Sequence, residues 1–163
     1  MVSKRKVLVT GGAGFIGSNV VAELVERGYS VVVIDNFDTG RRENLDGIDD
    51  DYDIIESDIR DRDAVRDAVE GAEYVIHEAA LTSVPGSVEE PAQTSEINCT
   101  GTAVVLEEAL EAGIEKVAVA SSAAVYGDGT PPLSEDDPVS PESPYALSKR
   151  WTESLARQFD ETH

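Results

Sequence analysis

The sequence is poor in the side chains that build metal sites and disulfides. It contains one cysteine, Cys99, and two histidines among its 163 residues. A single thiol cannot form an internal disulfide, and one cysteine with two histidines cannot complete a conventional structural zinc site. We therefore expect neither a bound metal nor a disulfide framework in this protein.

Long apolar runs and positive charges are also scarce. No run approaches the 18 apolar residues that predict a membrane-spanning helix, and no small-residue cleavage site follows a signal-type segment. The 13 basic side chains face 33 acidic ones, and the resulting formal charge of −20 repels nucleic acids and anionic membranes. We therefore expect a cytoplasmic protein that binds neither nucleic acid nor membrane.

The excess of acidic residues predicts a response to salt. Four of the 13 basic residues are lysines, and the acids are scattered along the chain as a solvated surface would have them. Such charge destabilises a compact chain by self-repulsion unless ions screen it. The composition resembles that of proteins from extreme halophiles, so we expect molar salt to stabilise the fold.

Short apolar runs alternate with segments of helical periodicity along the chain. The runs predicted as strands are 6–10, 30–35, 52–58, 74–80 and 116–122, and the predicted helices are 15–27, 61–70, 91–112 and 144–161. Strands separated by helix-length segments predict an α/β fold with a doubly wound, Rossmann-like parallel sheet of order 3-2-1-4-5. We expect residues 1–163 to form a single domain with long functional connections at 36–51 and 126–143.

A glycine-rich turn joins the first predicted strand to the first predicted helix. Gly11 permits a tight turn, Gly14 lets backbone amides approach a pyrophosphate, and Gly17 lets the helix pack closely on the sheet. The spacing is GxxGxxG, which differs from the GxGxxG of many dehydrogenases. A glycine turn without a ligand is the alternative interpretation of these residues alone.

An acidic residue at the end of the second predicted strand favours NAD. Asp35 lies 24 positions after Gly11, where a carboxylate can accept a hydrogen bond from a ribose 2′-hydroxyl and repel the 2′-phosphate of NADP. A role as a cap or turn former is the alternative. Arg41 and Arg42 lie close by in the sequence and keep NADP open, but Asp35 makes NAD our prediction.

Two further signals predict a catalytic site. Tyr145 and Lys149 are four positions apart on the last predicted helix, so the ammonium can lie beside the phenol, and a neighbouring cation lowers a phenol's pKa. Ser121 and Ser122 end the fifth predicted strand, where open α/β sheets bind ligands. Each signal alone is weak, since a surface tyrosine–lysine pair and a polar strand end are both common.

Together these motifs resemble the extended branch of the short-chain dehydrogenase/reductase superfamily, the NAD-dependent sugar-nucleotide epimerase/dehydratase family. The matching runs include TGGAGFIGSNVV, VIHEAA, SSAAVYG and SPYALSK. The resemblance implies a catalytic trio of Ser122, Tyr145 and Lys149. It also implies a cofactor site formed by Gly11, Gly14, Phe15, Ile16, Gly17, Asp35, Asn36, Asp58, Ile59, Ala79, Ala80, Asn98, Tyr145 and Lys149.

The resemblance implies a reaction as well, and it is strongest to members that epimerise UDP-hexoses. In these, a tyrosinate takes the proton of the sugar 4-hydroxyl while hydride passes to NAD, and the transient 4-keto sugar is reduced on its other face. Related dehydratases and decarboxylases usually carry an acid after the catalytic serine or threonine, whereas Ala123 and Ala124 follow Ser122 here. Glu78 stands where an apolar residue is frequent, and we expect no catalytic role for it.

Members of this family are nearly twice as long, so we expect this chain to stop before a substrate domain. A non-catalytic NAD-binding module and one half of a split epimerase are the alternatives to an active epimerase.

We also expect a homodimer through helices 91–112 and 144–161, because 103–106 is apolar around a whole helical turn. Pairing of two exposed edges of the fifth strand is the other route to a dimer.

Overall fold

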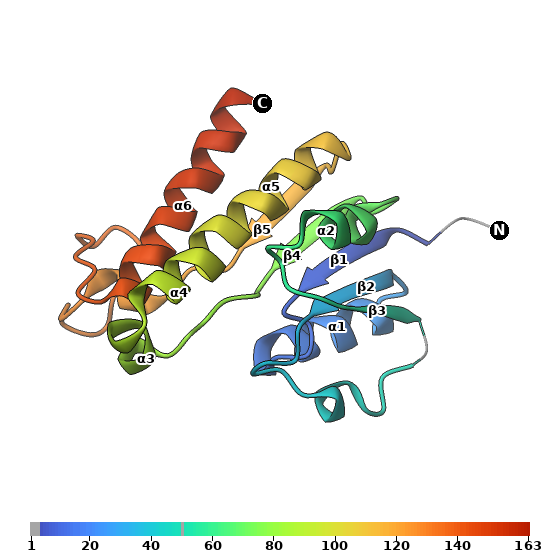
Figure 1. The fold of residues 1–163 in the computed structure, drawn as a ribbon, viewed down its shortest axis with the longest axis horizontal. Coiled ribbons are helices and arrows are strands. Elements are labelled where there is room, and N and C mark those ends of the chain that lie inside the picture. The colour runs from blue at the N-terminus through green and yellow to red at the C-terminus, as the bar shows by residue number, and fades with distance from the viewer. Residues whose placement is uncertain (1–3, 50) are drawn as a thin grey trace.

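Five strands form one parallel sheet whose order is β3-β2-β1-β4-β5, as the sequence predicts (Figure 1). The computed structural model describes residues 4–49 and 51–163, so residues 1–3 and 50 of the expected domain lie outside the described residues. The register places Val9 of β1 beside Val33 of β2 and Ile76 of β4. The strands are β1 (Lys6–Thr10), β2 (Ser30–Asp35), β3 (Tyr52–Glu56), β4 (Tyr74–His77) and β5 (Lys116–Val119).

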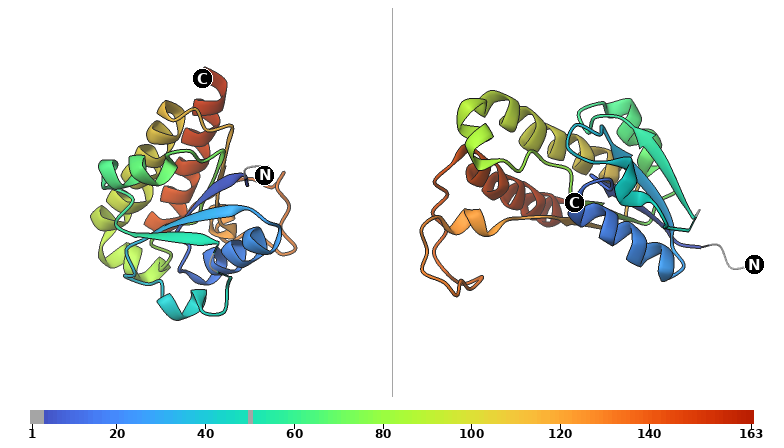
Figure 2. Two further views of the ribbon diagram at one scale, coloured as in Figure 1. Left: turned by 90° about the vertical axis from the view of Figure 1, so that its right-hand side faces the viewer. Right: turned by 90° about the horizontal axis from the view of Figure 1, so that it is seen from below.

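Helices cover both faces of the sheet, which explains why the central strands are apolar on both sides (Figure 2). On one face, Val21 of α1 (Phe15–Glu26) packs among Val7, Val9, Val31 and Val33. On the other face, side chains of α2 (Arg62–Val69) and α5 (Thr102–Glu111) pack against Leu8, Val32 and Ile34. The two layers hold the carboxyl ends of the strands at one edge.

The second half of the chain forms a pair of long helical segments that run side by side (Figure 1). One begins with α4 (Pro91–Ser95), passes through a π-helical stretch at Glu96–Gly101 and continues as α5. The other is α6 (Pro144–Thr162), whose first turn is capped by the Ser143 hydroxyl accepting from the Ala146 amide. Shorter elements are α3 (Val84–Glu89) and two 3₁₀ turns, Arg42–Leu45 and Ala123–Tyr126.

Three predicted strands extend too far, and one helix was not predicted. β3, β4 and β5 end at Glu56, His77 and Val119, two or three residues earlier than expected. The next amide after each strand still donates to the neighbouring strand, and the chain then turns into a loop. The unpredicted helix is α3, which contains Pro85 and Gly86, two residues that usually disfavour a helix. Its signal is the Ser83 hydroxyl, which accepts from the Gly86 amide and caps a first turn that tolerates proline.

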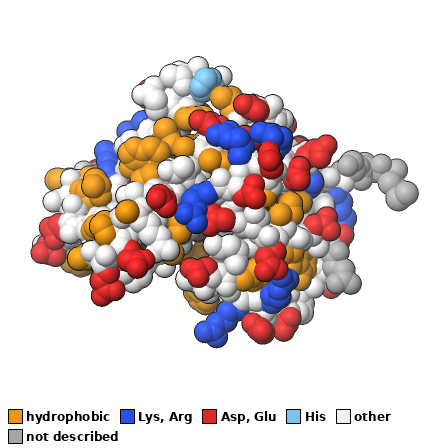
Figure 3. All heavy atoms as spheres, viewed as in Figure 1, with side chains coloured by type: hydrophobic (Ala, Val, Ile, Leu, Met, Phe, Trp, Pro, Cys, Tyr) orange, Lys and Arg blue, Asp and Glu red, His pale blue; other side chains and the backbone are white. Residues whose placement is uncertain are grey.

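Acidic and basic side chains are interspersed on the face of the molecule that Figure 3 shows. Several acidic and basic side chains form ion pairs. The most buried of these acids is Glu108 of α5, which is 1% exposed and accepts hydrogen bonds from Arg62 and Arg66 of α2. Removing one partner from such a buried charge costs more than losing an exposed pair. Among the described residues, no helix is long and apolar enough to cross a membrane.

Candidate functional site

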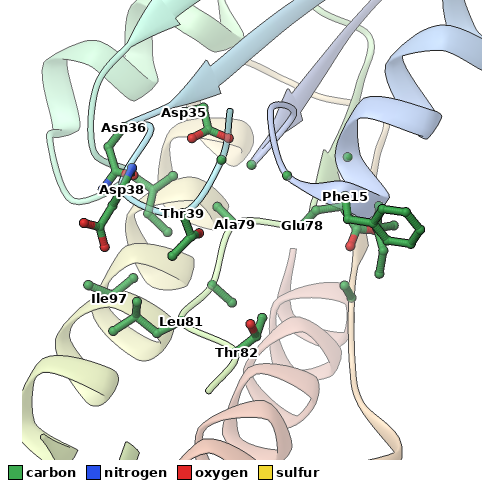
Figure 4. A pocket seen from close by; sticks show the side chains of 18 of the residues that line it. Phe15, Asp35, Asn36, Asp38, Thr39, Glu78, Ala79, Leu81, Thr82 and Ile97 are labelled. Carbon is green, nitrogen blue, oxygen red and sulfur yellow. The ribbon is translucent and has the colours of Figure 1, made fainter. Parts of the chain in front are cut away.

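A cleft of roughly 570 Å³ opens at the carboxyl ends of the strands (Figure 4). This is the edge at which parallel α/β sheets bind ligands, and the size falls within the range of about 300–1,000 Å³ for small-molecule and cofactor sites. Thirteen of the fifteen predicted site residues line it: Gly11, Gly14, Phe15, Ile16, Gly17, Asp35, Asn36, Asp58, Ile59, Ala79, Ala80, Tyr145 and Lys149. Ser122 and Asn98 lie outside the lining.

The glycine turn between β1 and α1 leaves no room for side chains. Gly11 has a φ of +68°, and a Cβ there would lie 2.7 Å from the Ala79 backbone nitrogen. A Cβ on Gly17 would lie 2.1 Å from the Gly11 carbonyl oxygen, so helix and loop are in backbone contact. The turn is therefore as tight as the sequence predicts, and it presents bare backbone to the cleft.

The amino terminus of α1 points its free amides into the cleft. Gly14 caps the helix without a side-chain hydrogen bond, and its first turn contains no acidic residue. The amides of Phe15 and Ile16 lie in this first turn, where an α-helix leaves its N–H groups without partners. Free amides and the helix dipole together form a site that favours an anion such as a pyrophosphate.

Asp35 is held rigidly at the end of β2. One carboxylate oxygen accepts from the Ala13 amide at 2.9 Å, and the other accepts from the Phe37 amide at 2.9 Å. The side chain therefore does form the turn that the alternative interpretation proposed, while it also lines the cleft. Each oxygen keeps a second lone pair, so the carboxylate can still accept from a ribose hydroxyl.

Asn36 and Asp58 extend the same end of the cleft. The Asn36 amide donates to the Asp58 carboxylate at 3.3 Å. Arg60 donates to both oxygens of Asp58 at 2.9 Å, and these hydrogen bonds lower the pKa of Asp58 despite its partial burial. Ile59 continues from this group into the core, where it is 5% exposed.

Arg41 and Arg42, the residues that made NADP the alternative cofactor in the sequence analysis, do not line the cleft. The Arg42 guanidinium donates to the Glu56 carboxylate and lies 4.2 Å from the centre of the Phe37 ring. Arg41 is exposed, and its backbone amide donates to the Ala13 carbonyl. The structure therefore places no arginine side chain of the described residues in the cleft beside Asp35 to receive a 2′-phosphate.

Tyr145 and Lys149 lie on the first two turns of α6, and both line the opposite end of the cleft. Both side chains are nearly fully buried, and the Lys149 ammonium donates to the Ala120 carbonyl at 3.1 Å. Burial lowers the pKa of Lys149, and the charge of Glu78 opposes this effect. A lysine held in this way presents its charge to the cleft with little freedom to move.

Ser122, the serine predicted to be catalytic, lies outside the cleft lining, whereas its neighbour Ser121 lies in it. Ser121 lines the cleft, and its hydroxyl donates to the Glu153 carboxylate on α6. The Ser122 hydroxyl accepts from the Ala124 amide at 3.2 Å and caps the turn Ala123–Tyr126. Because an accepting hydroxyl still carries its own proton, Ser122 retains the ability to donate a hydrogen bond.

A buried histidine fixes the wall of the cleft beyond β4. The Thr102 hydroxyl donates to the Asn98 carbonyl at 2.6 Å, so it accepts from His77 Nε2, 2.9 Å away. His77 Nδ1 then accepts from the Thr10 hydroxyl at 2.6 Å, and that hydroxyl accepts from the Ala79 amide. Burial lowers the pKa of His77 to about 3, so the ring is neutral.

Asn98 supports the same wall from behind. Its side chain accepts from the Leu81 amide at 2.8 Å and donates to the Leu81 carbonyl at 3.0 Å. It also donates to the Ser148 hydroxyl on α6 at 2.9 Å. Asn98 lies in the π-helical stretch, a local widening that is frequent at functional sites. Asn98 therefore holds the loop after β4 and α6 together behind the cleft.

Several lining residues were not predicted from the sequence. Besides Ile97 of the π-helical stretch, they lie on the loops after β2, β3, β4 and β5: Asp38, Thr39, Gly40, Ser57, Glu78, Leu81, Thr82 and Ala120. Ser121, which the sequence analysis placed at a ligand-binding strand end, also lines the cleft. The available signal for the loop residues was their position at or shortly after the end of a predicted strand. Among the residues that the structure describes, no group of three or more His, Cys, Asp or Glu side chains could hold a metal ion.

Comparisons with known proteins agree with this geometry. The model of the NAD dependent epimerase/dehydratase family matches residues 7–163. UDP-glucose 4-epimerase of Bacillus subtilis is 39% identical over 160 residues, which cover 94% of this chain and 47% of that protein. A UDP-N-acetyl-alpha-D-glucosaminuronate decarboxylase of Bacillus cytotoxicus is 39% identical over 98% of this chain and 49% of its own length.

Solved structures give the same result. UDP-glucose 4-epimerase of Thermus thermophilus, in complex with NAD, superposes with a TM-score of 0.88 at 38% identity. The match covers 96% of this chain and 51% of that one. The chain thus spans about half the length of the curated relatives and structures that it matches, and NAD is the cofactor of their family. The fold, the cleft and these similarities place the chain in the NAD dependent epimerase/dehydratase family.

Proposed function

We propose that this chain epimerises a UDP-hexose at carbon 4 through a transient 4-keto sugar, with NAD as the cofactor. The observation that carries the proposal is the content of one cleft, which combines the glycine turn, Asp35 and the Tyr145–Lys149 pair. Because the chain spans half of its relatives, a non-catalytic NAD-binding module and one half of a split epimerase remain the alternatives. Binding of NAD is common to all three.

The cleft fits NAD on three structural grounds. The backbone contact of Gly17 with Gly11 leaves bare backbone where a pyrophosphate would approach. The unpaired amides of Phe15 and Ile16 would hold that pyrophosphate, and the fixed carboxylate of Asp35 would accept from the adenosine ribose. Asn36, Asp58 and Ile59 would border the adenine end, and Ala79 and Ala80 would line the middle of the cleft.

The chemistry assigned to the chain's own residues is proton transfer at the sugar. Tyr145 takes the proton of the 4-hydroxyl and later returns it, and Lys149 holds its charge one helical turn away. Ser122 lies just outside the lining of the cleft, and on this proposal its hydroxyl would donate a hydrogen bond to the same sugar oxygen. Bound NAD would supply the hydride acceptor for carbon 4 and the source of the hydride that reduces the 4-keto sugar.

The residues after Ser122 favour epimerisation over elimination or decarboxylation. Ala123 and Ala124 begin the 3₁₀ turn and carry no group that can move a proton. A relative of nearly equal identity is a decarboxylase, so identity alone does not separate the two reactions. The lack of an acid at these two positions is the feature on which we base the choice.

Replacing Tyr145 with phenylalanine is expected to abolish conversion of UDP-galactose and leave NAD binding within about twofold. The substitution removes the proton carrier and keeps the ring that packs in α6. Conversion is measured in a coupled assay in molar KCl, and NAD affinity is measured by calorimetry. Tyr74→Phe is the matched control, because that hydroxyl bonds to Arg5 and Glu115 at the far end of β4 and should leave conversion unchanged.

The outcomes separate the candidates. Conversion by Tyr145→Phe at the parental rate would contradict our assignment of the base. A parent chain that binds NAD but converts no UDP-galactose would favour the NAD-binding module or the split enzyme over a complete epimerase.

We further propose a homodimer through α6. The turn at 103–106 no longer supports it, because Val104, Val105 and Leu106 are already buried within one copy of the chain. The proposed dimer is supported instead by two exposed apolar side chains one turn apart on α6, because Leu147 is 61% exposed and Trp151 is 40% exposed. Hydrophobic side chains gather along this side of the molecule in Figure 3.

Trp151→Glu is expected to convert a dimer through α6 into monomers in sedimentation, because it places a charge beside the exposed Leu147. A dimer formed by pairing of β5 edges would survive the substitution. A parent chain that sediments as a monomer in molar salt would contradict both forms.

A further inference from the structure

The carboxylate of Glu78 lies in the cleft and has no hydrogen-bonding partner among the described residues. Glu78 directly follows β4, and its backbone amide donates to the Thr10 carbonyl. Its half-buried side chain lies on the side of the cleft where Phe15 begins α1, away from Asp35 and Asn36 (Figure 4). No described residue donates a hydrogen bond to this carboxylate. The structure thus holds a negative charge in a partly desolvated place.

The charge that acts on Glu78 is Lys149. Among the described residues that line the cleft, Lys149 has the one positive side chain, while Asp35, Asp38, Asp58 and Glu78 are acidic. Burial raises the pKa of Glu78 and lowers the pKa of Lys149, and each charge opposes this effect on the other. The structure shows no salt bridge between these two residues, and the Lys149 ammonium donates to the Ala120 carbonyl.

These two charges lie at the end of the cleft that carries the Tyr145–Lys149 pair. On the proposed function, that end receives the nicotinamide ring, while Asp35 and Asn36 receive the adenosine. An oxidised nicotinamide ring is a cation and a reduced one is neutral. Lys149 alone would therefore favour the reduced cofactor by charge repulsion, and a carboxylate on the same cleft wall offsets that effect.

We propose that Glu78 makes the cleft prefer the oxidised form of NAD over the reduced form, an inference that rests on the proposed function. The preference matters chemically, because each epimerisation must begin with a cofactor that can accept a hydride. A cleft that favoured the reduced form would hold the enzyme in a state unable to oxidise the next sugar. Glu78 is thus a residue that selects the redox state of the cofactor and transfers no proton.

The test compares dissociation constants for NAD and NADH in molar KCl at about pH 8, where carboxyl groups are ordinarily ionised. Glu78→Gln keeps the shape and removes the charge, and it is expected to shift the affinity ratio about tenfold towards NADH. Glu78→Asp retains the charge and should restore most of the parental ratio. Glu111→Gln is the control for net charge, since Glu111 is exposed at the end of α5.

The results distinguish this inference from the proposed function. If the parent chain binds neither nucleotide, the proposed function fails and this inference fails with it. If both nucleotides bind and Glu78→Gln leaves their ratio at the parental value, the inference is overturned while the proposed function stands. A shift in Glu78→Gln that Glu78→Asp reverses and Glu111→Gln lacks would support it.

Discussion

Replacing Gly17 with alanine is expected to abolish NAD binding and to lower the free energy of unfolding by about 3 kcal/mol or more. The added Cβ would lie 2.1 Å from the Gly11 carbonyl oxygen and 2.8 Å from the Gly12 Cα. Both neighbours are backbone atoms, so no side-chain rotation can relieve the clash. The amino terminus of α1 must then move away from the turn, and its free amides no longer point into the cleft.

Gly28→Ala is the matched control for this experiment. Gly28 has a φ of +84°, but a Cβ there would meet no atom within 4 Å. Its cost is therefore conformational strain alone, about 1 kcal/mol, and NAD binding should persist. Calorimetric titration and denaturant unfolding measure both effects. Parental NAD affinity in Gly17→Ala would show that the backbone contact does not shape the site.

Acidification from pH 7.5 to pH 5 is expected to cost the parent chain about 2 kcal/mol of stability through His77. The buried ring has a pKa of about 3 in the folded chain, whereas an unfolded histidine titrates near its ordinary value of 6.5. As the pH falls below that value, the unfolded chain binds a proton that the folded chain excludes. Stability is therefore full above pH 7 and falls progressively towards pH 3.

The variant His77→Gln isolates this effect, because glutamine does not titrate and can still bond to Thr10 or Thr102. The unfolding free energies of parent and variant are compared at both pH values in molar KCl. Acidification also protonates surface carboxylates and so reduces their mutual repulsion, which would stabilise the fold, and the salt screens this opposite effect. The loss between the two pH values should be smaller in the variant by about 2 kcal/mol. His163→Gln, at the exposed end of the chain, should retain the parental loss. Equal losses in parent and His77→Gln would contradict the assignment of a buried neutral ring.

The order of the sheet could be predicted because the central strands are apolar on both faces. Val31, Val32 and Val33 of β2 are all buried, which is the pattern of a covered parallel strand. The bounds of β1 and β2 were predicted correctly, but the ends of β3, β4 and β5 were not. Ala79 and Ala80, for example, continue the small, apolar pattern after β4 has ended at His77. There the Ala79 amide donates to the Thr10 hydroxyl, a contact between residues distant in the sequence that the periodicity of apolar residues cannot predict.

The candidate site divides in the same way. Residues on regular elements, such as Asp35 at the end of β2 and Tyr145 on α6, were placed by motif and spacing, and both line the cleft. Residues on irregular loops were placed only in part: Gly11, Asp58 and Ala79 were predicted and line the cleft, whereas Asp38, Thr39 and Thr82 line it without having been predicted. Ser121 and Ser122 are equivalent in the sequence, and the backbone after β5 alone decides that Ser121 faces the cleft while Ser122 caps a turn.

The most direct test of our account is a calorimetric titration of the parent chain with NAD and with NADP in molar KCl. The fixed carboxylate of Asp35, with no arginine of the described residues beside it in the cleft, predicts one NAD per chain and at least about tenfold weaker binding of NADP. Asp35→Ala should narrow that difference. Equal dissociation constants for the two nucleotides, or no binding of NAD, would contradict the account.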